Sequence, residues 1–133
     1  MKRAVTIEAE LVTGLGEAAG FTSLDWARSA FRDAVGIDPY PGTVNLVPRS
    51  QAARADWDAV RAGPGIALPS PRADWCDARL YRARIGGQID AAIVVPEIDS
   101  YPTDQIELIA EVGVRSALGL TDGDLVSIEV FPA

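Results

Sequence analysis

The sequence predicts a mainly β protein, a small closed β-barrel of about six strands with two short helices. Short segments of alternating or continuous apolar residues recur along the chain, separated by turns rich in glycine, proline and aspartate. Only two segments carry a clear helical pattern with recognisable ends. Closing such a set of strands into a barrel removes exposed sheet edges, which favours the closed form over an open sheet.

The size and composition of the chain are those of one globular domain. It has 133 residues, taken here as a single domain over 1–133, and it is 48% hydrophobic and 23% charged. No apolar run approaches the roughly 20 residues needed to cross a bilayer. Its one cysteine, Cys76, allows no internal disulfide and no thiolate metal cluster. The start Met1-Lys2-Arg3 leads directly into a strand pattern rather than a signal peptide, so we expect a cytoplasmic location.

The charge balance and the lack of histidine narrow the chemistry. A net charge of −7 argues against nucleic acid or an anionic membrane as the main partner. Because the chain contains no histidine, Ser-His-Asp catalysis, Cys-His catalysis and histidine-bound zinc are all excluded. Any reaction must therefore use carboxylates, backbone amides, hydroxyls, arginine or a bound Mg²⁺.

The chain opens with a strand and a glycine-rich loop. Apolar residues alternate with polar ones from Val5 to Leu11, which is the period of a half-buried strand. The loop that follows, over 13–20, has glycines at 14, 16 and 20 whose backbone N–H groups suit a phosphate. A flexible hairpin connection is the alternative. The loop lacks the Gly-Lys-Ser/Thr ending of a P-loop, which excludes that family.

A helix and then a rigid turn come next. The helix is expected over Leu24–Val35, capped by Ser23 and closed by Gly36. The turn over 39–42 contains two prolines and a glycine, and a strand leaves it towards Leu46.

Two polar residues mark this strand as a candidate metal site. Thr43 and Asn45 lie two apart, so in an extended strand their side chains share a face. A hydroxyl and an amide oxygen are neutral, hard donors of the kind that Mg²⁺ accepts beside phosphate oxygens and water. The alternative is an ordinary strand with two polar residues facing water.

The second half of the chain supplies the remaining strands. Residues 48–75 interrupt the pattern, and we expect a variable excursion there with a short helix over 52–62. A hairpin is expected over Arg79–Ile85 and Gln88–Val95. It is followed by a strand over Ile106–Ala110, a short helix over Val114–Leu118 and a last strand over Leu125–Phe131. Glu107 is the only charge in its strand, and it is either a solvent-facing alternation or a placed acceptor.

Several segments, taken in order, resemble one known family. They are Val12-Thr13-Gly14-Leu15-Gly16-Glu17, the turn and strand over 36–46, Ile93-Val94-Val95-Pro96, Ile106–Ala110, Arg115 and Leu120-Thr121-Asp122-Gly123-Asp124. In this order they closely resemble the CTP-dependent riboflavin kinases best known from archaea. The likeness covers nearly the whole chain apart from 48–75, and it is far more specific than a lone glycine motif.

The resemblance implies a barrel of the cradle-loop (RIFT-like) type that holds CTP and riboflavin side by side with Mg²⁺. The implied reaction moves the γ-phosphate of CTP to the ribityl 5′-hydroxyl of riboflavin, giving FMN and CDP. The implied nucleotide contacts are Leu15, Gly16, Glu17, Ala18, Ala19, Gly20, Val112, Gly113, Val114 and Arg115. Thr43 and Asn45 match the Mg²⁺ ligands, while Asp99 and Glu107 match the flavin contacts. Glu107 is then the candidate to orient or deprotonate the 5′-hydroxyl.

Two departures from the family pattern leave alternatives open. Ala18 and Ala19 stand where the family loop usually has a third glycine and a basic residue. After the Val-Val-Pro, Asp99 and Tyr101 replace a common Thr-x-His-like pair. These changes remove a cation on the phosphate side and add an anion on the flavin side. A flavin- or nucleotide-binding barrel without transfer, or a related kinase for another small alcohol, are therefore the competing hypotheses.

Overall fold

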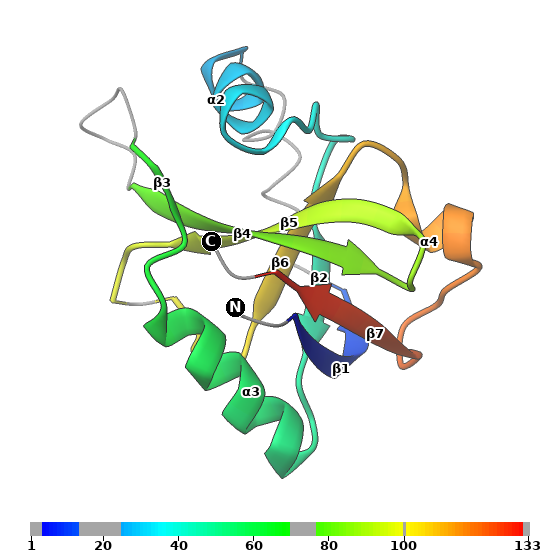
Figure 1. Ribbon diagram of the computed structural model, residues 1–133. Coiled ribbons are helices and arrows are strands. Elements are labelled where there is room, and N and C mark those ends of the chain that lie inside the picture. The colour runs from blue at the N-terminus through cyan, green and yellow to red at the C-terminus, as the bar shows by residue number, and fades with distance from the viewer. Residues whose placement is uncertain (1–3, 14–24, 70–76, 100, 132–133) are drawn as a thin grey trace.

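The protein is a closed antiparallel β-barrel with three short helices among the residues that the structure describes (Figure 1). The computed structural model describes residues 4–13, 25–69, 77–99 and 101–131. The strands are β1 (Val5–Val12), β2 (Val44–Val47), β3 (Ile66–Leu68), β4 (Ala78–Ile85), β5 (Ile89–Pro96), β6 (Ile106–Ala110) and β7 (Leu125–Val130). The helices are α2 (Asp25–Val35), α3 (Gln51–Ala62) and α4 (Val114–Leu118).

Six strands form the barrel, which confirms the predicted architecture. The sheet order is β3-β4-β5-β6-β2-β1-β7, and an additional pairing of β4 with β7 closes the ring. Strand β3 lies outside the ring, paired only with β4. It was not predicted, because its three residues are too few to show a period.

The barrel interior is filled by one residue of every two along each strand. In β1, for example, Ile7, Ala9 and Leu11 are buried while Thr6 and Glu8 are exposed. The inward side chains from all six strands join one apolar core, and its fully buried members include Ile7, Leu11, Leu46, Ile85, Ile93, Ile106, Leu108 and Ile128. This alternation is the period that identified the strands in the sequence.

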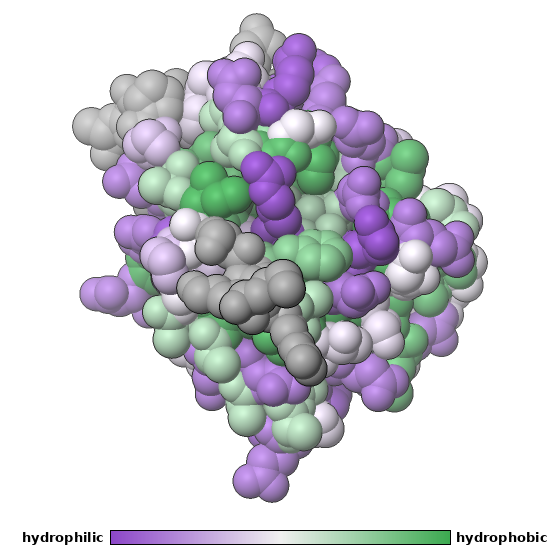
Figure 2. Space-filling model, in the orientation of Figure 1, coloured by the Kyte–Doolittle hydropathy of each residue, from purple (hydrophilic) through white to green (hydrophobic). Residues whose placement is uncertain are grey.

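A second apolar layer covers part of the outer face of the barrel. Helix α2 packs Ala27 and Phe31 onto outward-facing side chains of β4, β5 and β6, among them Ala92 and Ile109. Strand β5 is therefore covered on both sides, which explains its continuous apolar run over 91–95. The far side of α2 is hydrophilic and faces water at the top of the molecule (Figure 2).

The excursion over 48–75 is partly regular and contributes to the core. The short helix expected there is present as α3, which Ser50 caps by accepting a hydrogen bond from the backbone N–H of Ala53. Trp57 on this helix is only 1% exposed and belongs to the same core as the inward side chains of the barrel. Arg79 on β4 donates to the carbonyls of Arg61 and Gly63 at 2.9 and 2.8 Å, so the barrel also holds the end of the helix.

Replacing Trp57 by alanine should lower the free energy of unfolding by about 3–5 kcal/mol, because it empties a large buried site. Urea denaturation followed by circular dichroism measures this change. Asp56→Ala, at an exposed position of the same helix, is the matched control and should change stability by about 0.5 kcal/mol or less. A Trp57→Ala variant as stable as the control would show that α3 is not an integral part of the fold.

Candidate active site

A polar cluster lies on the outer face of the barrel where β2 meets β6. The register of this antiparallel pair puts Asn45 directly opposite Glu107. Because their neighbours Leu46 and Leu108 point into the core, Asn45 and Glu107 both point outward, on the same face as Thr43. Cross-strand partners of this kind lie close enough for their side chains to interact.

Glu107 accepts hydrogen bonds from specific neighbouring side chains and is not simply a polar strand residue that faces solvent. One carboxylate oxygen, Oε1, accepts hydrogen bonds from the hydroxyl of Tyr101 at 2.7 Å and from Nε2 of Gln105 at 3.1 Å. The other oxygen, Oε2, accepts from Oγ1 of Thr43 at 3.2 Å. The carboxylate therefore accepts hydrogen bonds from the turn before β2 and from the loop between β5 and β6.

Gln105 and Tyr101 extend the cluster, and neither was predicted as a site residue. Nε2 of Gln105 also donates to Oδ1 of Asn45 at 3.2 Å, so one amide bridges Asn45 and Glu107. Burial raises the pKa of Tyr101, and the charge of Glu107 and the hydrogen bond to it raise this pKa further. The phenol is thus held as a neutral donor to Glu107. Tyr101 was noted only as a departure from the family pattern, and no local signal singled out Gln105.

Asp99, by contrast, is not brought into this cluster. It is exposed on the loop after β5, and within the described part of the chain no hydrogen bond joins it to Glu107. Tyr101, two residues further on, makes that contact instead.

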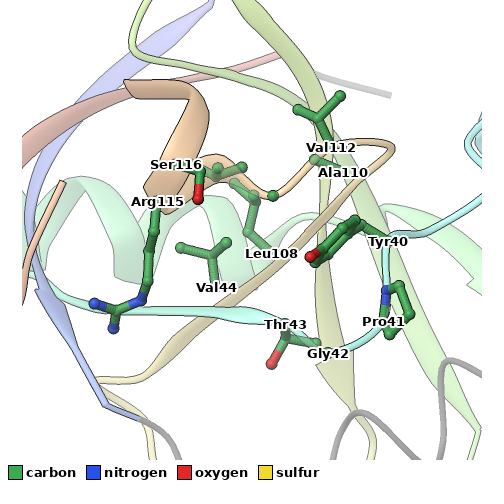
Figure 3. Close-up of a pocket in the computed structure, with 12 residues that line it drawn as sticks. Tyr40, Pro41, Gly42, Thr43, Val44, Leu108, Ala110, Val112, Arg115 and Ser116 are labelled. Carbon is green, nitrogen blue, oxygen red and sulfur yellow. The ribbon is translucent and has the colours of Figure 1, made fainter. Parts of the chain in front are cut away.

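A pocket of about 270 Å³ opens beside the cluster (Figure 3). It lies between the turn before β2, the end of β6 and the start of α4, and the predicted residues Val112, Gly113, Val114 and Arg115 all line it. The opposite wall comes from Tyr40, Pro41, Gly42, Thr43 and Val44. Thr43 therefore belongs to both the pocket and the polar cluster.

The turn before β2 is fixed against β6, which gives the pocket a firm wall. The backbone N–H of Tyr40 donates to the carbonyl of Ala110 at 2.7 Å. The prolines on either side of Tyr40 restrict the backbone further. The ring of Tyr40, 55% exposed, lies against Gly113 at the pocket rim.

Arg115 ties the pocket to the end of β1. Its Nη2 donates to Oδ1 of Asp122 at 2.6 Å and to the carbonyl of Val12 at 3.1 Å. Asp122 also accepts a hydrogen bond from the hydroxyl of Thr13. That bond, together with the one from Arg115, holds the pKa of the Asp122 carboxyl below its usual value, so Asp122 stays ionised and balances the charge of Arg115.

The predicted nucleotide loop follows directly on Thr13. Its residues Leu15, Gly16, Glu17, Ala18, Ala19 and Gly20 lie outside the described residues. The hydrogen bonds from Arg115 to Asp122 and from Thr13 to Asp122 place Thr13, the last described residue before this loop, close to the pocket. Sequence reasoning named Arg115 but missed Asp122, because the pairing depends on the fold.

The donor set of the cluster suits Mg²⁺ accompanied by phosphate and water. Within the described ranges no three Asp, Glu, His or Cys residues gather to hold a metal. Because Thr43 gives its hydroxyl hydrogen to Glu107, Oγ1 can offer its lone pairs to a cation. Asn45 receives one hydrogen bond on Oδ1 and keeps its second lone pair. A protein often supplies only one or two of the oxygen ligands of Mg²⁺, and phosphates and water complete the coordination shell. The neutral oxygens of Thr43 and Asn45 would fill that part.

No helix among the described residues is long and apolar enough to cross a membrane.

Comparison with known proteins identifies the family. The family model CTP-dep_RFKase, described as the domain of unknown function DUF120, matches residues 11–130. The riboflavin kinase of Pyrobaculum calidifontis is 40% identical over 132 residues, covering 96% of this chain and 60% of the relative. That of Archaeoglobus fulgidus is 36% identical over 129 residues, covering 96% and 55%. That of Sulfolobus acidocaldarius is 32% identical over 132 residues, covering 97% and 83%.

The chain spans less than two thirds of the length of the first two of these relatives and most of the third. The family match covers both strands of the polar cluster and every wall of the pocket. The chain therefore belongs to the CTP-dependent riboflavin kinase family.

Proposed function

We propose that this chain transfers the γ-phosphate of CTP to the 5′-hydroxyl of riboflavin. The observation that carries the proposal is the position of Thr43, which lies in the wall of the pocket and in the polar cluster at once. A nucleotide in the pocket and a hydroxyl at Glu107 would then meet at Thr43. The names of the relatives and of the family support riboflavin as the acceptor and CTP as the donor.

The nucleotide side of the proposed site is the pocket and the loop after β1. Val112, Gly113 and Val114 offer backbone groups and apolar surface to a base or ribose. The glycine-rich loop over 15–20 follows Thr13 in the sequence, and the backbone amides of such a loop are suited to phosphates. Arg115 is linked through Asp122 to Thr13, and it acts as a positioning group as well as a nearby cation.

Thr43 and Asn45 are the residues that we propose to hold Mg²⁺. When bound, the ion supplies positive charge to the phosphate oxygens and fixes their orientation. Because both ligands are neutral, they do not reduce the positive charge of the ion. This charge offsets the repulsion between the phosphates and a chain whose net charge is −7. Glu107, next to both ligands, orients Thr43 by accepting its hydroxyl hydrogen.

Glu107 is the group that we propose to receive the acceptor hydroxyl. The 5′-oxygen forms a bond to the γ-phosphorus, the bond from that phosphorus to the bridging oxygen breaks, and CDP leaves with the electron pair. The hydroxyl proton passes to Glu107 or to water. Because such transfers depend on positioning more than on a strong base, the main task of Glu107 is to orient the hydroxyl. Asp99 stays a predicted flavin contact on the neighbouring loop.

A binding barrel without transfer is the second candidate, and two observations favour it. Ala18 and Ala19 leave the loop without the usual basic residue. Arg115 is paired with Asp122, so part of its charge is already balanced. Because CTP is an intracellular nucleotide, we propose that the transfer takes place in the cytoplasm.

The test is to incubate the protein with riboflavin and either CTP or ATP, with Mg²⁺ or with EDTA, and to separate the products by chromatography. We expect FMN and CDP in equal amounts from CTP with Mg²⁺, and none with EDTA. Riboflavin binding without FMN formation from either nucleotide would exclude the kinase and leave the binding barrel.

Asn45→Ala should lower kcat by about 100-fold or more, because it removes a metal ligand that acts on the transferring group. Circular dichroism should show an unchanged fold. Ser127→Ala, at an exposed polar position on β7, is the matched control and should keep full activity. Equal turnover in the two variants would remove Asn45 from the metal site.

Glu107→Gln should lower kcat by about 10- to 100-fold, with a smaller change in the KM for riboflavin. The substitution keeps the shape but removes a charged acceptor, a loss corresponding to roughly 1.5–3 kcal/mol. Glu129→Gln on β7 is the control, since Glu129 is also half-buried on a strand. Steady-state kinetics that match wild type in both constants would show that Glu107 does not contact the acceptor.

A further inference from the structure

Gln105 is the one side chain in the cluster that bonds to both Asn45 and Glu107 in the described structure. We propose that it is a positioning residue through which Glu107 fixes the orientation of the Asn45 amide. The inference rests on the proposed function, because it concerns the Mg²⁺ that Asn45 would hold. It assigns a role to a residue that is neither a metal ligand nor a substrate contact.

The first step is the orientation of Gln105. An ionised carboxylate can only accept hydrogen bonds, so the group that faces Glu107 must be the NH₂ of the glutamine amide and not its oxygen. The observed contact is this one, from Nε2 of Gln105 to Oε1 of Glu107 at 3.1 Å. The negative charge on Glu107 thus selects one of the two flipped forms of the Gln105 amide.

In the second step, the orientation of the Gln105 amide determines the orientation of the Asn45 amide. The same Nε2 carries a second hydrogen, which it donates to Oδ1 of Asn45 at 3.2 Å. If the Asn45 amide were flipped, two NH₂ groups would face one another and an NH₂ would stand where a cation needs an oxygen. Gln105 therefore holds the oxygen, and not the NH₂, of the Asn45 amide towards its own side of the Asn45–Glu107 pair.

The third step is the fixed position of Gln105 itself. It lies on the loop between β5 and β6, two residues after Thr103, whose carbonyl accepts hydrogen bonds from Nε1 of Trp57 at 3.1 Å and from Nη1 of Arg61 at 3.3 Å. Trp57 is buried in the barrel core, so helix α3 braces this loop from a rigid base. The excursion over 48–75 thereby gains a role in holding the loop that orients the metal ligand.

The consequence is a metal affinity that depends on a residue outside the coordination shell. Outer residues that orient a metal ligand typically change affinity by about 10- to 100-fold when they are removed. Gln105→Leu keeps similar bulk but has no donor for Asn45 or Glu107. We expect it to weaken the Mg²⁺-dependent part of CTP binding about tenfold, while binding measured in EDTA stays the same.

The experiment is calorimetric titration of CTP, with Mg²⁺ and with EDTA, in the absence of riboflavin so that no turnover occurs. Wild type, Gln105→Leu and Asn45→Ala are compared with the double variant. Gln88→Leu, at an exposed glutamine in the β4–β5 turn, is the control and should bind as wild type does. Gln105→Ala replaces Gln105→Leu if the latter does not fold, as judged by circular dichroism.

If Gln105 acts through Asn45, then Gln105→Leu should have no further effect on Mg²⁺ dependence once Asn45 is alanine. Unchanged binding in Gln105→Leu, or a tenfold loss that persists in the Asn45→Ala background, would overturn the inference alone and leave the kinase proposal intact. Wild-type protein that binds no CTP with Mg²⁺ and forms no FMN would overturn both.

Discussion

The antiparallel pairing of β2 with β6 is the constraint on which the site depends. Its register sets Asn45 against Glu107 on the outside while Leu46, Ile106 and Leu108 fill the core. A slip of one residue would turn these apolar side chains to the outside, at roughly 1.5–3 kcal/mol for each of them. The slip would also bury a carboxylate and an amide without partners. The apolar alternation of two short strands therefore determines where the polar groups stand.

Within this frame Glu107 organises the residues around it. Its carboxylate accepts hydrogen bonds from Thr43, Tyr101 and Gln105, and Gln105 donates in turn to Oδ1 of Asn45. The proposed metal ligands, Thr43 and Asn45, are neutral. The negative charge that orients their side chains belongs to Glu107, which is not itself a proposed ligand. Two apolar layers, the barrel core and the contact with α2, hold the strands that carry this network.

Much of the fold was predictable from the sequence, and less of the site. The strands followed from their period, and the shared face of Thr43 and Asn45 followed from their spacing. Glu107 stayed ambiguous because its hydrogen-bond donors come from the turn before β2 and from the loop between β5 and β6. Tyr101, Gln105 and Asp122 could not be found from local pattern, since each acts through a contact that the fold creates. Trp57 likewise lay in a stretch of Ala, Arg and Asp with little visible periodicity.

The most direct test of this account is a crystal structure with a non-hydrolysable CTP analogue, riboflavin and Mn²⁺ in place of Mg²⁺, with the metal located by its anomalous scattering. Mn²⁺ accepts the same oxygen ligands. The account predicts a single metal peak within bonding distance of Oγ1 of Thr43 and Oδ1 of Asn45, with the ribityl 5′-oxygen in hydrogen-bond distance of Glu107. A metal bound away from both residues, or a flavin on another face of the barrel, would contradict it.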